Sequence, residues 1–145
     1  MPLITERVAL ARNGENDKFI CRMASGWAVM GDVQFLPGYC LLLPDPVVAS
    51  LNDLDAQART TYLLDMARIG DAVLQATGAV RMNYEILGNS EPELHCHIFP
   101  RYATEPEHHR KMPAWFYDWK TAIPYAEETH GELRKNIAQL LTGPL

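Results

Sequence analysis

The chain has no apolar run that approaches the roughly 20 residues needed to span a bilayer. Its first 13 residues also lack the apolar core of a secretory signal peptide. The sequence therefore predicts a protein without a membrane anchor, and we expect a cytoplasmic location.

Positive charge is scarce, because 13 Lys and Arg face 18 Asp and Glu and the formal net charge is −5. Such a balance excludes a broad basic surface for nucleic acid or anionic membrane. It leaves room for a small phosphorylated ligand held by local hydrogen-bond donors.

Cysteine is limited to Cys21, Cys40 and Cys96, an odd number at wide spacing, each within an apolar run. This pattern favours buried free thiols over disulfides or a Cys-x-x-Cys zinc site. It also suits a reducing compartment such as the cytoplasm.

The length of 145 residues predicts one domain, residues 1–145, with one sizeable core. We expect a core over about residues 19–102 and a C-terminal extension over 103–145. Apolar residues recur at three- and four-residue steps between Asp55 and Thr77, which predicts a long amphipathic helix capped by Asp55 and ended by Gly78. Shorter helices are expected over residues 3–12 and 127–141, and strands over residues 19–23, 27–30, 38–43, 80–87 and 94–99. The predicted fold class is α+β, an antiparallel sheet of about five strands with one long helix packed on it and a helical tail.

Residues 88–102 contain the chain's most informative motif, Glu93-Leu94-His95-Cys96-His97, between two prolines. In a strand, alternate side chains share a face, so Glu93, His95 and His97 are expected to project together. Three interpretations stay open. One imidazole attacks phosphorus while its neighbour holds the phosphoryl oxygens; or the three side chains bind a metal ion; or they form the polar face of a half-buried strand.

The segment Glu93-Leu94-His95-Cys96-His97-Ile98-Phe99-Pro100-Arg101 resembles the signature of the histidine triad (HIT) family of nucleotide hydrolases and transferases, His-x-His-x-His followed by two apolar residues. Residues 37–44 resemble the family's upstream strand, which ends in proline. The resemblance covers roughly residues 27–102. It implies a HIT-like fold, a homodimer and a nucleotide or dinucleotide substrate.

The resemblance also implies roles for individual residues. The family's nucleophile maps to His95, and its phosphate-contacting histidine maps to His97, while Glu93 replaces the first histidine of the triad. Tyr39 stands where another histidine is usual. Ser90 matches the family's phosphate-binding residue, Asn83 matches an asparagine on the preceding strand, and Asp32 matches the residue that bonds the ribose hydroxyls. These three residues and Tyr39 are the expected substrate-binding residues.

The function expected from this resemblance is nucleotidyl hydrolysis or transfer at the α-phosphate, through a nucleotidyl-histidine and without a metal or other cofactor. Dinucleoside polyphosphates and nucleoside phosphoramidates are both candidate substrates. Two alternatives are a nucleotide sensor without turnover and a metal-binding hydrolase that uses Glu93, His95 and His97. The aromatic cluster at residues 115–119 is expected to pack either on a partner subunit or within its own.

Overall fold

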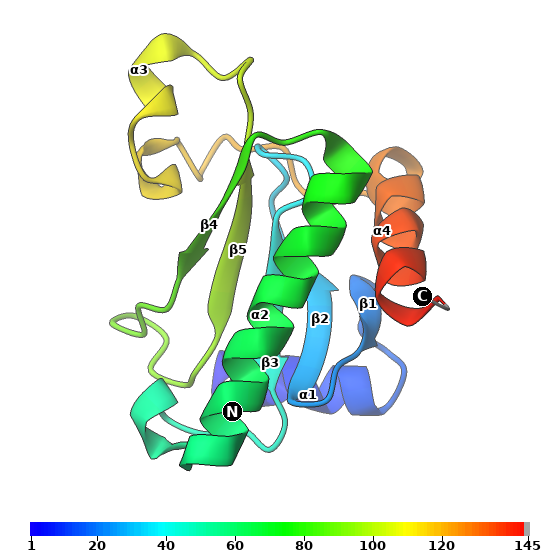
Figure 1. Ribbon diagram of the computed structural model, residues 1–145, viewed down its shortest axis with the longest axis vertical. Coiled ribbons are helices and arrows are strands. Elements are labelled where there is room, and N and C mark those ends of the chain that lie inside the picture. Colours follow the sequence, from blue (N-terminus) through cyan, green and yellow to red (C-terminus); the bar gives the residue numbers. More distant parts are fainter. Residues whose placement is uncertain (144–145) are drawn as a thin grey trace.

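The computed structural model describes residues 1–143, which form one five-stranded antiparallel sheet flanked by helices (Figure 1). The strand order is β1-β2-β3-β5-β4, so β3 and β5 are the inner strands that neighbour each other. The strands are β1 (Phe19–Arg22), β2 (Gly26–Met30), β3 (Cys40–Pro44), β4 (Arg81–Glu85) and β5 (Cys96–Arg101). The predicted α+β class and strand number are confirmed.

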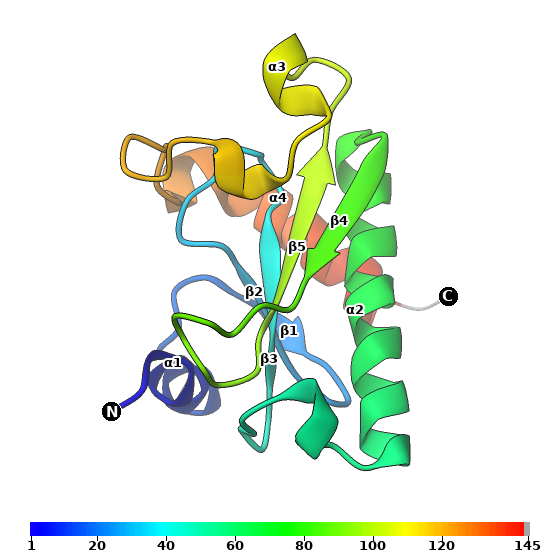
Figure 2. The same cartoon turned by 90° about the vertical axis from the view of Figure 1, so that its left-hand side faces the viewer.

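The helices lie on both sides of this sheet. Helix α2 (Ala56–Thr77) covers one face, and α4 (Glu127–Thr142) packs beside it and against β1. On the opposite side lie α1 (Leu3–Arg12) and the segment with the short helix η2 (Ala114–Phe116), while α3 (Glu107–Arg110) lies beyond the end of β5, as Figure 2 shows. A further short helix, η1 (Leu51–Asp53), precedes α2. None of the helices within residues 1–143 is long and apolar enough to cross a membrane.

The long helix begins and ends where its sequence predicts. The side chain of Asp55 accepts a hydrogen bond from the N–H of Ala58, and Gly78 ends the helix in the left-handed conformation at φ 73°. Tyr62, Ile69 and Val73 are buried along its inner face. The predicted helices at residues 3–12 and 127–141 are also present as α1 and α4.

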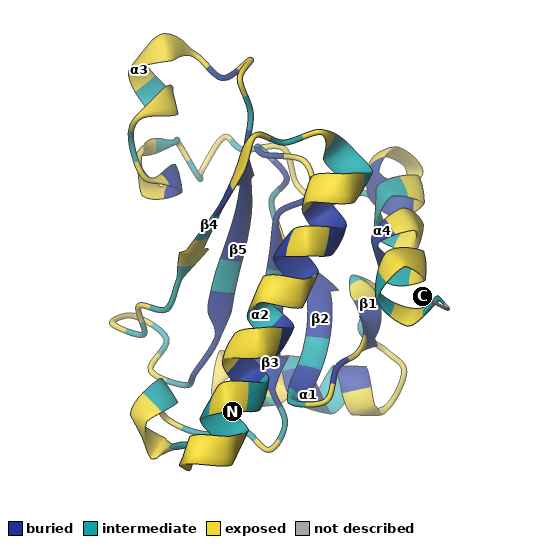
Figure 3. Cartoon of the chain, in the orientation of Figure 1, coloured by how far each residue is buried: buried dark blue, intermediate teal, exposed yellow. Residues whose placement is uncertain are grey.

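Both faces of the inner strands are covered, as Figure 3 shows for β5, where most residues are buried. Cys40, Leu42, Cys96 and Ile98 join the main core beneath α2. The alternate residues face the other side, where Leu43 packs with α1 and Phe99 packs with Tyr39. His97 lies between these two clusters on that second face.

The fifth strand differs from the prediction in its position. It was expected over residues 94–99, stopped by Pro100, but it spans Cys96–Arg101 and includes the proline. Strand β3 pairs only with residues 96–98 of β5, so Pro100 has a strand neighbour on one side only, where a missing N–H is tolerated. His95 and Glu93 therefore precede the strand instead of lying within it.

Candidate functional site

A cavity of about 320 Å³ opens on the sheet face that carries His97. Its floor comes from β2, β3 and β5, one wall from α1, and the opposite wall from the aromatic segment after β5. The lining residues are Leu3, Ile4, Arg7, Val29, Asp32, Val33, Tyr39, Leu41, Leu43, Glu91, His95, His97, Trp115 and Trp119. The cavity is thus mostly apolar with a few polar groups, as expected for a small-molecule site.

His95 is held in one orientation by its own backbone. Its Nδ1 lies 2.7 Å from the carbonyl oxygen of Glu93, and because a carbonyl only accepts hydrogen bonds, Nδ1 carries the hydrogen. In the neutral ring, Nε2 then bears the free lone pair. The side chain is only 7% exposed, so little water competes for that nitrogen.

His97 lies beside it, with the two ring centroids 4.8 Å apart. Burial, reinforced by the neighbouring His95, lowers the pKa of His97 from 6.5 to about 4. The ring is therefore neutral at neutral pH. It offers one donor and one acceptor nitrogen.

Tyr39 binds the second imidazole from the adjacent strand. Its hydroxyl lies 2.7 Å from Nδ1 of His97, and burial raises the pKa of the phenol above 10, so the hydroxyl keeps its proton. The ring fits because residue 31 is glycine: a Cβ at Gly31 would lie 2.2 Å from Cδ2 of Tyr39. The residue that contacts Nδ1 of His97 is thus Tyr39, which stands at a sequence position where a histidine is usual in the resembling family.

Glu93 does not line this cavity, although it lines a neighbouring hollow together with His95. Its carboxylate turns toward α1, where it accepts hydrogen bonds from the backbone N–H of Thr5 at 3.0 Å and from the Thr5 hydroxyl at 2.7 Å. The expected row of three side chains depended on an unbroken strand, which begins only at Cys96. Within residues 1–143, no group of three or more His, Cys, Asp or Glu side chains is arranged to hold a metal ion.

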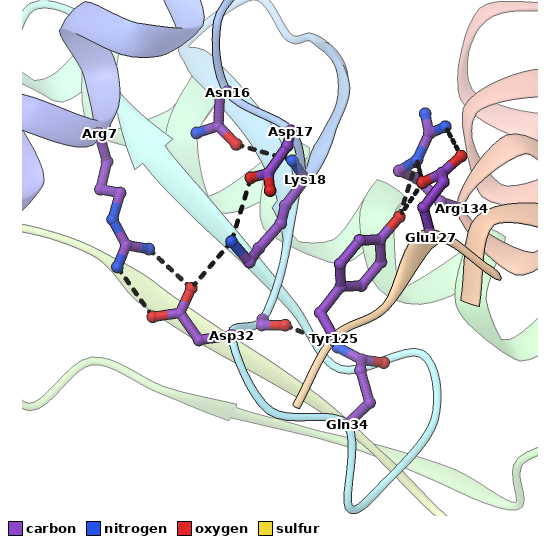
Figure 4. A network of polar contacts seen from close by, with 10 residues as sticks. Arg7, Asn16, Asp17, Lys18, Asp32, Gln34, Tyr125, Glu127 and Arg134 are labelled. Atoms are coloured by element: carbon purple, nitrogen blue, oxygen red, sulfur yellow. Dashed lines mark hydrogen bonds and ion pairs between the residues drawn. The ribbon is translucent and has the colours of Figure 1, made fainter. Parts of the chain in front are cut away.

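Asp32 lines the cavity just after β2 and pairs with two positively charged side chains, Arg7 and Lys18 (Figure 4). Both of its oxygens accept hydrogen bonds from the guanidinium of Arg7 at 2.8 Å, and Lys18 lies 3.8 Å away. Burial alone would raise the pKa of Asp32, but the hydrogen bonds and charge of Arg7, together with the charge of Lys18, outweigh it and lower that pKa. The carboxylate is therefore ionised and oriented.

Two of the predicted ligand contacts lie outside this cavity. Ser90 is exposed in the turn before β5 and does not line it. Asn83 lies on β4, where its Oδ1 accepts a hydrogen bond from Arg101 at 2.9 Å and it lines a separate hollow. The structure thus brings together His95, His97, Tyr39 and Asp32, and leaves Ser90, Asn83 and the carboxylate of Glu93 apart from them.

The aromatic segment packs within its own subunit. The rings of Trp115 and Trp119 stack with centroids 4.6 Å apart, and Trp119 also contacts Phe35 at 4.8 Å. The rings of Trp115 and His97 are perpendicular, with centroids 4.8 Å apart, and Nε1 of Trp115 donates a hydrogen bond to Glu85. The sequence identified this cluster as a cover for an apolar surface, but it gave no sign that the surface was the site.

Arg7 and the other α1 residues of the cavity wall were not anticipated. Leu3, Ile4 and Arg7 lie in a short helix that mixes apolar and charged residues, a pattern that carries no mark of ligand binding. Their role in the site depends only on where α1 docks.

The fold and the site together define a class of protein: a small α+β domain with a pair of histidines beside an apolar cavity. The chain matches the HIT domain over residues 16–104, well over half its length, and it belongs to the HIT family. That family comprises nucleotide-binding hydrolases and transferases.

Solved structures share this fold at low sequence identity. A histidine triad (HIT) protein from Sinorhizobium meliloti is 22% identical with a TM-score of 0.75, covering 90% of this chain and 94% of that one. A histidine triad protein from Marinobacter aquaeolei is 21% identical with a TM-score of 0.77, covering 97% and 96%. A hypothetical histidine triad nucleotide-binding protein from Sulfolobus tokodaii is 16% identical with a TM-score of 0.72, covering 94% and 91%. No curated protein sequence matches the chain.

Proposed function

We propose that this chain is a nucleotidyl hydrolase or transferase that acts on the α-phosphate of a nucleoside phosphate derivative through a covalent intermediate on His95. The observation that carries the proposal is the 2.7 Å contact between Nδ1 of His95 and the Glu93 carbonyl, which leaves Nε2 as a nucleophile beside the cavity. A solved HIT neighbour described as nucleotide-binding supports the choice of ligand.

His97 is suited to holding a phosphoryl oxygen. Phosphoryl oxygens of a nucleotide only accept hydrogen bonds, so a neutral His97 must present Nε2–H to bind one. Tyr39 meets this need when its hydroxyl donates to Nδ1 of His97, because the proton of the ring then resides on Nε2. A high pKa makes Tyr39 a poor proton source, so this pair orients a donor and does not deliver a proton.

The reaction then proceeds in two displacements. The Nε2 lone pair of His95 forms a bond to the α-phosphorus, the bond to the leaving group breaks with its electron pair, and the departing group takes a proton from solvent. Water next attacks the same phosphorus and releases a proton to solvent, the P–N bond breaks, and its electron pair returns to Nε2. The products are a nucleoside monophosphate and the protonated leaving group, and the path requires no metal.

The test is incubation with dinucleoside polyphosphates and nucleoside phosphoramidates, followed by mass spectrometry of the products and of acid-quenched protein. We expect a nucleoside monophosphate product and a protein mass increase of one nucleotidyl group. His95→Ala should remove both while retaining nucleotide binding, whereas His108→Ala, at an exposed histidine of α3, should retain both. Turnover by His95→Ala near the parent rate would refute the nucleophile assignment.

A nucleotide sensor without turnover is the second candidate. It is favoured by the two departures from the family's histidines, since the Glu93 carboxylate is engaged by Thr5 and Tyr39 retains its proton. Calorimetry would then give micromolar or tighter nucleotide binding with no product from any substrate tested. Turnover at about one per second or faster would exclude this candidate.

We also propose that the chain forms a homodimer, as the family resemblance implies. Exposed apolar side chains near the β4 edge and on α2 support it, among them Leu64 at 59% and Leu87 at 52% exposure. Light scattering at tens of micromolar should give twice the 16.4 kDa chain mass. A monomer at that concentration would contradict the proposal.

A further inference from the structure

Helix α1 is attached to the rest of the molecule by carboxylates from three different segments. Glu93, before β5, accepts two hydrogen bonds from Thr5; Asp32, after β2, pairs with Arg7; and Asp45, after β3, pairs with Arg12. The helix also has an apolar face, on which Ile4 and Val8 are buried against a cluster from β2, β3 and the segment after β3: Trp27, Val29, Leu41, Leu43 and Val47. Two of the polar contacts are partly exposed ion pairs, so the contact with Glu93 is the polar one most able to add to this apolar packing.

The contact with Glu93 is the one that satisfies the start of the helix. Pro2 occupies the N-cap position and provides no side-chain hydrogen bond, so the first N–H groups of α1 lack a local partner. Glu93 supplies the missing acceptor to the N–H of Thr5 from 88 residues away. A helix of 10 residues is shorter than the roughly 12–15 residues at which isolated helices become stable in water, so α1 depends on such contacts.

The same residue also contacts the proposed nucleophile. The side chain of Glu93 holds Thr5, while its backbone carbonyl accepts the Nδ1–H of His95 at 2.7 Å. Glu93 is therefore a single connection between the helix that forms one wall of the cavity and the imidazole that lies in it.

From this double contact we infer that Glu93 is a positioning residue: it docks α1 as a wall of the nucleotide cavity and couples that docking to the orientation of His95. The inference rests on the proposed nucleotidyl transfer and assigns to Glu93 a role other than acid, base or metal ligand. It also means that the histidine usual at this position in the family would not replace Glu93, since an imidazole cannot accept two hydrogen bonds from Thr5 as a carboxylate does.

The experiment compares Glu93→Ala, Glu93→Gln and Glu93→His with the parent, and uses Glu132→Ala as a matched control. Glu132 is on the exposed side of α4, with 88% of its side chain accessible. Three quantities are measured: hydrogen exchange of the α1 amides, the Nδ1–H signature of His95 in nitrogen-15 NMR spectra, and the split between KM and kcat.

In Glu93→Ala and Glu93→His, we expect the amide hydrogens of α1 to exchange with solvent at least tenfold faster than in the parent. The NMR signal of the His95 Nδ1–H should weaken. In the kinetics, KM should rise about tenfold and kcat should fall. Glu93→Gln retains a side-chain oxygen and should lie between these variants and the parent. Thr5→Val, which removes only the hydroxyl, should give a smaller change in the same direction.

Unchanged exchange of α1 in Glu93→Ala would overturn the inference, and so would parental KM and kcat in Glu93→His. If Glu93→Ala does not fold, Glu93→Gln and Thr5→Val provide the same comparison. Exchange and NMR need no turnover, so they test the coupling even if no substrate is hydrolysed. If the proposed function is wrong, the parent protein will form no product from any substrate. The Glu93 variants would still show faster hydrogen exchange in α1.

Discussion

The hydroxyl of Tyr39, the residue just before β3, lies 2.7 Å from Nδ1 of His97 on β5. Both groups are neutral at neutral pH, because burial raises the pKa of the phenol and lowers that of the imidazole to about 4. The contact is therefore a hydrogen bond between uncharged partners, and it determines which nitrogen of His97 presents a hydrogen to the cavity.

Tyr39→Phe should lower kcat about tenfold with little change in KM. The ring still fills its place, but Nδ1 of His97 loses its donor, so part of the population moves its proton to Nδ1 and no longer donates from Nε2. The effect should be smaller than the roughly 10²–10³-fold loss seen when an oxyanion donor is removed outright. Steady-state kinetics measure it, with Tyr84→Phe, a tyrosine 38% exposed on the sheet edge, as control. A kcat equal to the parent's would show that the Tyr39 hydroxyl does not orient His97.

The low pKa of His97 predicts a specific loss of stability in mild acid. The folded-state pKa of about 4 lies below the unfolded value of 6.5, so between pH 6.5 and pH 4 the unfolded chain binds more protons. This contribution to stability is full above pH 6.5 and is lost as pH falls. Between pH 7 and pH 5 the linkage amounts to about 2 kcal/mol.

Urea unfolding at the two pH values measures this loss. His97→Asn should reduce the pH dependence by about 2 kcal/mol, whereas His108→Asn, at an exposed position, should leave it unchanged. Equal slopes for the parent and His97→Asn would contradict the low pKa.

Asp32→Asn should weaken ribonucleotide binding about tenfold and 2′-deoxyribonucleotide binding much less. A hydrogen bond from a sugar hydroxyl to a carboxylate contributes about 1.5–3 kcal/mol, which an amide provides only in part. Arg7→Ala removes the ion pair but keeps the carboxylate, so it should retain the preference for ribose. Calorimetry with matched ribo- and deoxyribonucleotides measures both. If Arg7→Ala loses the preference for ribonucleotides and Asp32→Asn keeps it, sugar recognition belongs to Arg7 and not to Asp32.

Trp119→Ala should destabilise the chain by about 3 kcal/mol, because the indole packs against Phe35, Tyr39 and Phe99 within the same subunit. Phe116, 61% exposed three residues earlier, is the control, and its replacement by Ala should change stability by about 0.5 kcal/mol or less. Denaturant unfolding at two protein concentrations measures both. A Trp119→Ala effect that depended on protein concentration would indicate packing across a subunit interface instead.

Local patterns in the sequence were sufficient for most of the fold. The cap at Asp55, the glycine at 78 and the three- and four-residue spacing between them determine α2, because each acts within one or two helical turns. The continuously apolar residues 38–43 indicated a strand covered on both faces, as β3 is. The family resemblance over residues 27–102 identified the two histidines that line the cavity.

Tertiary structure alone decided how the site is completed. The expected row of three side chains included Glu93, but the strand begins at Cys96, and the carboxylate turns to the N–H of Thr5, in the first turn of α1. Arg7 reaches Asp32 only because α1 packs beside the sheet, near the segment that follows β2. The sequence by itself determined the elements and the reactive residue types, since these follow from neighbours along the chain. The partners of Glu93, Asp32 and His97 lie 88, 25 and 58 positions away, and only packing of the finished fold brings such residues within hydrogen-bond distance.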